Sequence, residues 1–126
     1  MGQGVAVDEK RQRAAEPEDL SRFFLERANA GDVEGLVALY EPGAVLAFPP
    51  GQLSIGSDAI RAAYENLLAD RPTFGAGDQQ PAIRNDTGDL ALTSTRLAGR
   101  GATAEVARRQ PDGSWLWIID QPAVLG

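Results

Sequence analysis

The side chains that could do chemistry in this 126-residue chain belong to few types. There is no histidine and no cysteine, and the only lysine is Lys10. These absences exclude a histidine base, a cysteine nucleophile and a thiolate zinc site, and they argue against a buried Schiff-base lysine. Any catalysis must use carboxylates, arginine, tyrosine, hydroxyls, tryptophan or backbone groups. No acidic cluster has the spacing of a calcium loop, so we expect no metal ion and no cofactor.

Arg96 and Glu105 are the strongest candidates for a chemical pair. If Gly99-Arg100 forms a two-residue hairpin loop, Ala98 pairs with Gly101. Arg96 and Glu105 then become diagonal neighbours on one face of the hairpin. Exposed, they would form an ordinary ion pair of small energetic worth. Inside an apolar pocket, Glu105 would be an acid–base group and Arg96 its electrostatic partner. The residues alone leave both interpretations open.

The same register, continued through a type I turn at residues 110–113, gathers one set of side chains on one sheet face. This face is apolar at one end and polar at the other, as expected for a pocket wall. A one-residue slip would exchange the two faces. The residues expected on this face are Leu90, Leu92, Ser94, Arg96, Thr103, Glu105, Ala107, Trp115, Trp117, Ile119 and Gln121.

The opposite face is too apolar to lie in open solvent. It carries Val106, Leu116 and Ile118, whereas a meander with one wet face should alternate cleanly. We therefore expect a homodimer in which two copies pack sheet to sheet. Asp120 falls on this second face, where solvent or a dimer contact is favoured over catalysis.

Periodicity and turn residues predict the elements that carry these side chains. Leu20, Phe23, Phe24 and Ala28 form a helical stripe after Pro17. A second, short helix capped by Asp32 should run to Tyr40, and Ser57 should cap a third that buries Ile60 and Tyr64. Strands are expected at 44–48 and 52–55, then at 82–85, 89–97, 102–109 and 114–121.

Helices at one end of the chain and an antiparallel meander at the other predict an α+β fold. The length suits one domain, which we place at 17–126 after a tail at 1–16. The net charge of −6 argues against a nucleic-acid partner, and no apolar run is long enough for a membrane helix. The first 13 residues lack the apolar core of a signal peptide, so we expect a cytoplasmic protein.

Two segments carry a resemblance to a known family. They are the run Ala28-Asn29-Ala30-Gly31-Asp32 leading into Leu36–Tyr40, and Gly56-Ser57-Asp58-Ala59-Ile60-Arg61 after a Pro-Gly turn. With the strand pair from Ala107 to Asp120, they resemble the SnoaL-like, ketosteroid-isomerase-like branch of the nuclear-transport-factor-2-like superfamily. The resemblance implies a cone-shaped, cystatin-like roll: a bent, mostly antiparallel sheet wrapped around three helices, usually in a homodimer.

The resemblance also implies a pocket for a small apolar molecule, lined in part by Phe24, Phe48 and Tyr64. Steroid isomerases of this branch place a tyrosine where this chain has Phe24 and a base where it has Phe48, and only Glu105 matches their acid. Polyketide cyclases of the branch rely on histidine. Epoxide hydrolases of the fold need an Asp, Arg and Asp cluster around a water molecule, and Arg96 and Glu105 could supply part of such a cluster. The chain is therefore an isomerase-, cyclase- or hydrolase-type enzyme without the usual base, or a binding or dimerisation module without chemistry.

Overall fold

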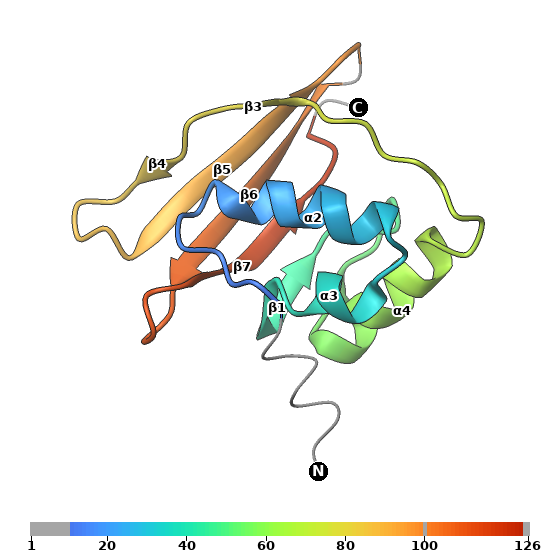
Figure 1. The fold of residues 1–126 in the computed structure, drawn as a ribbon, viewed down its shortest axis with the longest axis horizontal. Helices are drawn as coiled ribbons and strands as arrows, with labels where there is room; N and C mark the ends of the chain where they lie inside the picture. Colours follow the sequence, from blue (N-terminus) through green and yellow to red (C-terminus); the bar gives the residue numbers. More distant parts are fainter. Residues whose placement is uncertain (1–10, 100, 125–126) are drawn as a thin grey trace.

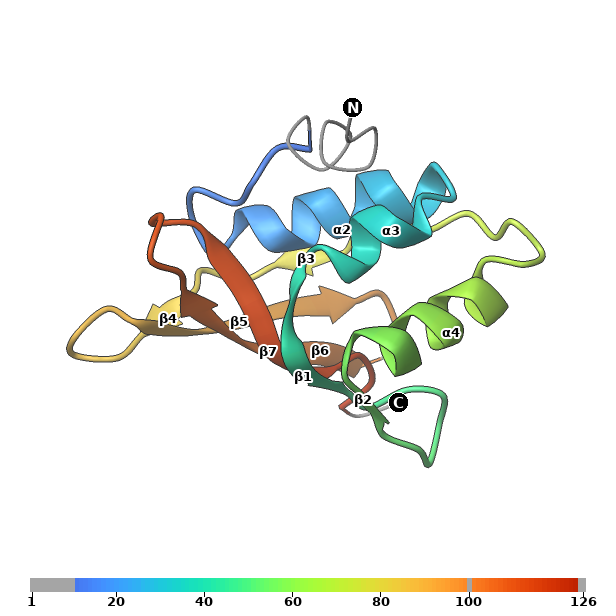
Figure 2. The ribbon, with the colours of Figure 1, turned by 90° about the horizontal axis from the view of Figure 1, so that it is seen from below.

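Three helices of the described chain pack on one side of a bent, seven-stranded sheet (Figure 1, Figure 2). The computed structural model describes residues 11–99 and 101–124. We call the sheet face under the helices the concave face, and the opposite face the convex face. The elements are α2 (Asp19–Asn29), α3 (Val33–Val37), α4 (Ser57–Leu67), β1 (Tyr40–Leu46), β2 (Ser54–Ile55), β3 (Asp78–Gln79), β4 (Ile83–Arg84), β5 (Leu90–Leu97), β6 (Gly101–Arg109) and β7 (Trp115–Gln121).

The sheet order is β2-β1-β7-β6-β5-β3, and β4 also pairs with β5. Strand β1 runs parallel to β7, and the other pairs are antiparallel. The predicted α+β class with a mostly antiparallel sheet is confirmed. A long segment at 69–82, which we call the strap, runs from α4 across the end of the sheet and carries β3 (Figure 1). Strand β3 was not predicted, because its two residues are too few to show a period.

The first two helices follow the expected local rules. Helix α2 buries Leu20, Phe23 and Ala28. The Asp32 side chain caps α3 by accepting a hydrogen bond from the Gly35 amide at 3.0 Å, as predicted. A Cβ on Gly35 would lie 2.1 Å from Asp32 Oδ2, so this tight cap requires glycine.

The end of the second helix differs from the prediction. Helix α3 stops at Val37, and Tyr40 already pairs with Trp117 as the first residue of β1. The apolar run therefore divides between a helix and a strand, because pairing with β7 outweighs the local helical pattern. The predicted third helix is present as α4, but the prediction that Ser57 caps it is wrong, because Ser57 is its first residue, Gly56 is the cap and no side chain bonds there.

The β5–β6 hairpin has a three-residue loop, not the expected two, because Leu97 pairs with Gly101. Gly99 and Gly101 both have positive φ, at 65° and 83°, which glycine adopts without strain. The one-residue shift turns every β5 side chain to the other face. The predicted pocket-wall positions of Leu90, Leu92, Ser94 and Arg96 are therefore wrong, because these residues alternate with buried Ala91 and Thr93 and belong to the convex face.

A β-bulge exchanges the faces on which the last side chains of β7 lie. Ala107 pairs with Trp117 but Val106 pairs with Ile119, so β7 holds one extra residue there. Asp120 turns inward and is 5% exposed, whereas Ile119 turns outward and is 52% exposed. The predicted faces of Ile119, Gln121 and Asp120 are therefore wrong, whereas Thr103, Glu105, Trp115 and Trp117 lie on the concave face as expected.

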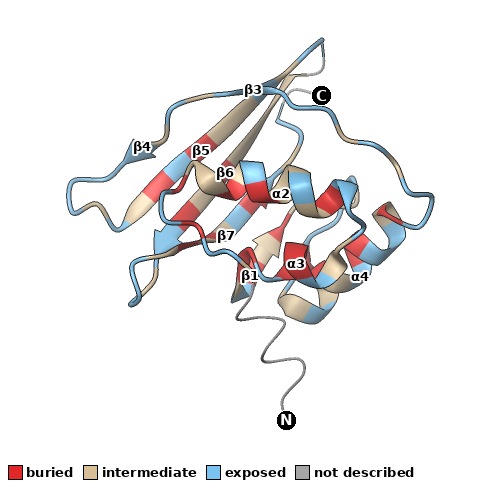
Figure 3. Cartoon of the chain, viewed as in Figure 1, coloured by how far each residue is buried: buried red, intermediate tan, exposed pale blue. Residues whose placement is uncertain are grey.

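The core lies between the helices and the concave face, where the buried residues gather (Figure 3). Part of the predicted tail joins it. Ala14 is buried, and its carbonyl accepts a hydrogen bond from the Trp115 amide at 3.0 Å. The rest of the predicted tail, residues 1–10, lies outside the described residues.

Candidate functional site

Three polar side chains are buried side by side on the concave face. The registers place Thr93 on β5 opposite Glu105 on β6, and Glu105 opposite Asp120 on β7. All three are at most 5% exposed. Two carboxyl groups on directly opposed positions of neighbouring strands are close enough to interact strongly. Glu105 and Asp120 are the two buried carboxylic residues among the described residues.

Glu105 is held by a short chain of hydrogen bonds. Thr93 Oγ1 donates to Glu105 Oε1 at 2.6 Å, and Trp117 Nε1 donates to Thr93 Oγ1 at 3.2 Å. Burial raises the pKa of the Glu105 carboxyl, and the hydroxyls of Thr103 and Thr93 offset part of that rise.

Asp120 lies at the end of a second chain of hydrogen bonds, which runs through two tyrosine hydroxyls. Tyr40 Oη donates to Asp120 Oδ2 at 2.5 Å, and the hydroxyls of Tyr40 and Tyr64 lie 2.5 Å apart. Burial, followed by the charge of Glu105, raises the pKa of Asp120 to about 7, although the Tyr40 hydrogen bond lowers it in part. Asp120 therefore exchanges a proton near neutral pH.

The two tyrosines stay protonated over the physiological range. Burial and the nearby Asp120 carboxylate raise the pKa of both phenols well above the ordinary value. Each hydroxyl can then pass a proton on without itself becoming a stable phenolate. When Asp120 is ionised, the hydrogen bonds run from Tyr64 to Tyr40 to Asp120. When Asp120 is protonated, the chain can reverse, so that the Tyr64 hydroxyl is free to donate elsewhere.

Aromatic rings enclose the Tyr64 end of this chain. Phe24 lies 6.2 Å from Tyr64 between ring centroids, and Phe74 of the strap packs edge-on against Phe24 at 6.0 Å. Asn29 fixes the strap by bonding to both the amide and the carbonyl of Phe74, at 2.7 and 3.0 Å. Phe48 also packs against the core and is partly buried.

The structure separates the two residues expected to act together. Glu105 is buried in the cone, whereas Arg96 is exposed on the convex face, because of the one-residue shift in β5. Two clefts of about 480 and 540 Å³ are present, but both lie near the β6–β7 turn and neither is lined by Glu105. The cone itself is occupied by aromatic rings.

Sequence reasoning missed Tyr40, Thr93 and Asp120 as members of one cluster. Asp120 was placed on the wrong face because of the bulge, and the expected loop length placed Ser94, not Thr93, on the face of Glu105. The pair of glycines flanking Arg100 was a signal of ambiguity, because it fits a loop of two or three residues. Nothing in the run from Leu116 to Ile119 marks where the bulge occurs.

Within 11–99 and 101–124, no group of three or more acidic side chains is gathered to hold a metal ion. Helices in the same ranges are all too short or too polar to cross a membrane.

The comparisons with known proteins agree with this architecture. The model of the SnoaL-like domain matches residues 21–120, so the chain belongs to the SnoaL-like family. No curated protein sequence matches the chain. The fold is the cystatin-like fold found in the nuclear-transport-factor-2-like superfamily, as the resemblance predicted.

Three solved structures illustrate the likeness. A candidate calcium/calmodulin-dependent protein kinase type II association domain from Thiobacillus denitrificans has a TM-score of 0.72 and 16% identity, over 92% of this chain and 100% of that one. A ketosteroid isomerase-like protein from Erwinia carotovora atroseptica has a TM-score of 0.63 and 19% identity, over 95% of each chain. A candidate dehydratase of the NTF2-like family from Streptomyces avermitilis has a TM-score of 0.63 and 18% identity, over 85% of this chain and 93% of that one.

Proposed function

We propose that this protein binds a small apolar molecule inside the cone and transfers a proton on it, as an isomerase or a related lyase or hydrolase would. Asp120 is the acid–base group, and Tyr40 and Tyr64 relay the proton between Asp120 and the ligand. The single observation that carries the proposal is the buried Tyr64–Tyr40–Asp120 chain, whose carboxyl has a pKa of about 7. Two of the similar structures are named a ketosteroid isomerase-like protein and a candidate dehydratase, and isomerisation and dehydration both involve proton transfer, which agrees with this chemistry.

The relay conserves protons at each step. A proton leaves a carbon of the ligand for Tyr64 Oη, the Tyr64 proton passes to Tyr40 Oη, and the Tyr40 proton passes to the Asp120 carboxylate. The electron pair of the broken C–H bond stays on the ligand, delocalised as an enolate. The reverse sequence returns a proton to another carbon of the same ligand, which moves a double bond. A general base with a pKa near the working pH is the most effective kind.

Glu105 acts on this chain through its charge. It lies opposite Asp120 and disfavours a second negative charge there, which helps to keep the Asp120 pKa near neutrality. Glu105 is therefore a positioning residue in this proposal, whereas the sequence analysis named it as the candidate acid–base group.

A ligand can reach Tyr64 only if the Phe74 ring, which packs against Phe24, moves away. Phe74 belongs to the largely exposed strap and is tied to α2 through the Asn29 side chain (Figure 3). Outward movement of the strap would remove the Phe74 ring from Phe24 and open a path toward Tyr64. The ligand then replaces the Phe74 ring, so an apolar body is required.

Two measurements test the proposal. Nile red, an uncharged apolar dye, should bind about tenfold more tightly to Phe74→Ala than to the wild type, and unchanged to Leu53→Ala, a matched loss of apolar surface away from the strap. A panel of β,γ-unsaturated ketones should be converted to conjugated enones, as followed by ultraviolet absorbance. Asp120→Asn should lower kcat by about 10² to 10⁴ with little change in KM. Arg96→Gln serves as the control and should have no effect.

Failure of the wild type to convert any ketone of the panel, or equal kcat in wild type and Asp120→Asn, would overturn the catalytic proposal. Nile red affinity that does not respond to Phe74→Ala would overturn the proposed entry path.

A second candidate is a dimerisation module, and a distinct observation favours it. One row of apolar side chains crosses six strands on the convex face, with each residue paired to the next: Ile55, Val45, Ile119, Val106, Leu92 and Ile83. Four of the six are exposed. A continuous apolar stripe on a sheet face is typical of a protein–protein contact.

We propose that a second copy of the chain covers this row. A twofold interface brings the same patch of both subunits together, and a flat row of branched side chains can pack against its own copy. Sedimentation equilibrium should show a dimer whose dissociation constant rises at least 100-fold in Ile119→Glu, at the centre of the row. Leu53→Glu, an exposed apolar position off the row, should leave it unchanged. A monomeric wild type would contradict this assembly.

A further inference from the structure

The strap is attached unevenly along its length as it runs from α4 past β3 (Figure 1). Its second half is part of the sheet, because Asp78 and Gln79 pair with β5. The Gln80 amide continues this pairing by donating to the Ser94 carbonyl oxygen at 2.9 Å. The Gln79 side chain also donates to the carbonyl oxygen of Glu18, at the start of α2, at 2.7 Å. This half therefore has two independent supports, one on β5 and one on α2.

The preceding part of the strap, residues 72–77, is held by one side chain, that of Asn29. Asn29 Oδ1 accepts a hydrogen bond from the Phe74 amide at 2.7 Å, and Asn29 Nδ2 donates to the Phe74 carbonyl oxygen at 3.0 Å. Across residues 72–77, every one of which the structure describes, no other hydrogen bond joins the strap to the molecule. Asn29 is exposed, so water competes for both of its bonds and their net contribution is modest.

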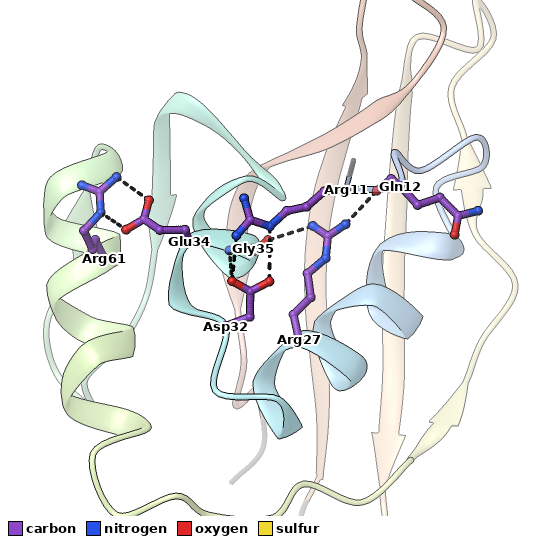
Figure 4. Close-up of polar contacts among 7 residues, drawn as sticks. All are labelled: Arg11, Gln12, Arg27, Asp32, Glu34, Gly35 and Arg61. Atoms are coloured by element: carbon purple, nitrogen blue, oxygen red, sulfur yellow. Dashed lines mark hydrogen bonds and ion pairs between the residues drawn. The ribbon is translucent and has the colours of Figure 1, made fainter. Parts of the chain in front are cut away.

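The helix that carries Asn29 is firmly placed. Arg27, two residues earlier, donates from Nη1 to the carbonyl oxygen of Gly35 at 2.8 Å and from Nη2 to that of Gln12 at 2.7 Å (Figure 4). The apolar stripe of α2 is buried in the core. Separation of Asn29 from Phe74 therefore requires movement of the strap rather than of α2.

Arg71, where the strap leaves α4, has a strained backbone. Its φ is 51°, and among the described residues it is the one residue other than glycine with a positive φ. A left-handed backbone is unfavourable for a residue with a Cβ, and a residue before a proline, here Pro72, favours an extended backbone. The closed position of the strap therefore holds strain at this end. Movement that returns Arg71 to an extended backbone relieves it.

Two glycines mark the boundary between the loosely held and the firmly held parts. A Cβ on Gly77 would lie 2.5 Å from Thr95 Cγ2 and 2.7 Å from the Arg96 carbonyl oxygen, so the strap backbone packs directly on β5 there. A Cβ on Gly75 would meet nothing within 4 Å. The close contact with the sheet therefore begins at Gly77, and the strap before it has room to move.

We propose that residues 71–77 form a lid over the aromatic cluster, which opens at Arg71 while Gly77 stays on β5. Asn29 holds the lid closed. Phe74 moves with the lid, because both Asn29 bonds are to its backbone, and its ring then uncovers the aromatic ring beneath it. The inference rests on the entry path proposed above for the cone. It adds to that path the moving segment, the residue that holds it and the strained residue that favours opening.

Amide hydrogen exchange, followed by nuclear magnetic resonance without any ligand, tests the lid directly. The Phe74 amide reports on the lid, and the Gln80 amide reports on the part of the strap that stays on the sheet. In the wild type, the protection factor of Phe74 should be about tenfold or more below that of Gln80. Arg71→Asn should raise the Phe74 protection factor about fivefold, because asparagine adopts a left-handed backbone more readily than arginine does. The Gln80 protection factor should not change.

Two glycine substitutions form a matched pair. Gly77→Ala places a methyl group against β5 and should lower the Phe74 protection factor about tenfold. Gly75→Ala adds the same methyl group in open space and should leave that protection factor unchanged. If Gly77→Ala does not fold by circular dichroism, Arg71→Asn decides the question.

Equal protection of the Phe74 and Gln80 amides in the wild type would overturn the lid. Parallel changes of both amides in Arg71→Asn would overturn it as well, because the strap would then move as one piece with β3.

Stopped-flow mixing with Nile red tests whether the lid controls entry to the cone. Asn29→Ala should speed dye association about tenfold, whereas Arg71→Asn should slow it about fivefold. Asn66→Ala, at an exposed asparagine of α4 whose side chain bonds no described residue, is the matched control and should leave the rate unchanged. Equal rates in the wild type and Asn29→Ala would overturn the control of entry.

The two measurements separate this inference from the function proposed for the cone. If Nile red binds neither the wild type nor Phe74→Ala, the cone proposal fails, and with it the control of entry. The protection factors of Phe74 and Gln80 still decide the lid in that case, because no ligand takes part in them.

Discussion

The two faces of one sheet reverse the usual distribution of polarity. The concave face, turned toward the core, buries Thr93, Glu105 and Asp120. The convex face, turned toward solvent, exposes Leu92 and Ile119 within a row of six apolar side chains. Each arrangement is unfavourable for an isolated monomer, because buried carboxyls lose hydration and exposed apolar surface orders water. The contrast indicates that stability alone did not select these side chains.

At the end of β7, a change of backbone geometry explains why a carboxyl group is buried and an isoleucine is exposed. Alternation along a strand assigns each residue to a face, and the β7 bulge exchanges Ile119 and Asp120. Without the bulge, the carboxyl would face solvent and the isoleucine would fill the core. The same local feature therefore places both the buried acid and one member of the exposed row, Ile119, so the two proposals can be tested from opposite sides of one strand.

The largest effect on the free energy of unfolding should come from the ionisation of the buried Asp120 carboxyl group. Its pKa is about 7 in the folded state against an ordinary 3.8, so the folded state holds its proton more tightly. Stability should fall as the pH rises from about 4 to 7, by on the order of 4 kcal/mol, and stay low above pH 7. Asp120→Asn should remove most of this fall. Urea unfolding at pH 5 and pH 8 measures it, and an unchanged slope in the variant would contradict the assignment.

A smaller loss of unfolding free energy should follow from removing the hydrogen bonds that Thr93 makes with Glu105 and Trp117. Thr93→Val keeps the shape but leaves Glu105 and the Trp117 indole without their shared partner, which should cost about 2 kcal/mol of unfolding free energy. The control is Thr95→Val, two residues along the same face, whose hydroxyl makes no hydrogen bond to any described residue. Chemical denaturation compares the two, and equal losses would show that Thr93 is a packing residue only.

The smallest effect should be found on the convex face. Leu92→Ala should change the unfolding free energy of dilute, monomeric protein by less than about 0.5 kcal/mol. Leu46→Ala, at a fully buried position of β1, should cost about 2–5 kcal/mol. Similar losses in the two variants would mean that the convex face is covered within the monomer and needs no partner.

Local patterns predicted most of the fold. The stripe from Leu20 to Ala28 identified α2, and the turn at residues 110–113 was predicted correctly, with Gly113 at φ 87° and Gln110 bonded to Ser114. These features depend on neighbours in sequence, which periodicity and turn chemistry describe well. The family resemblance then supplied the cone, which periodicity alone does not specify.

The site was less predictable because it depends on side-chain direction. Glu105 was placed correctly, since its strand has no irregularity before it. Arg96 and Asp120 were placed on the wrong faces by one residue of loop and one residue of bulge. Each irregularity changes the backbone energy little but rotates the following side chains by half a turn. A sequence pattern with period two does not reveal the length of the loop or the position of the bulge.

The most direct test of the central claim is the titration of Asp120 itself. Carbon-13 NMR of the aspartate carboxyls, assigned by comparison with Asp120→Asn, follows its ionisation as the pH changes. The midpoint should lie near pH 7 and should shift toward lower pH in Glu105→Gln, because the neighbouring charge is then absent. A midpoint near the ordinary value of 3.8, with no response to Glu105→Gln, would contradict it.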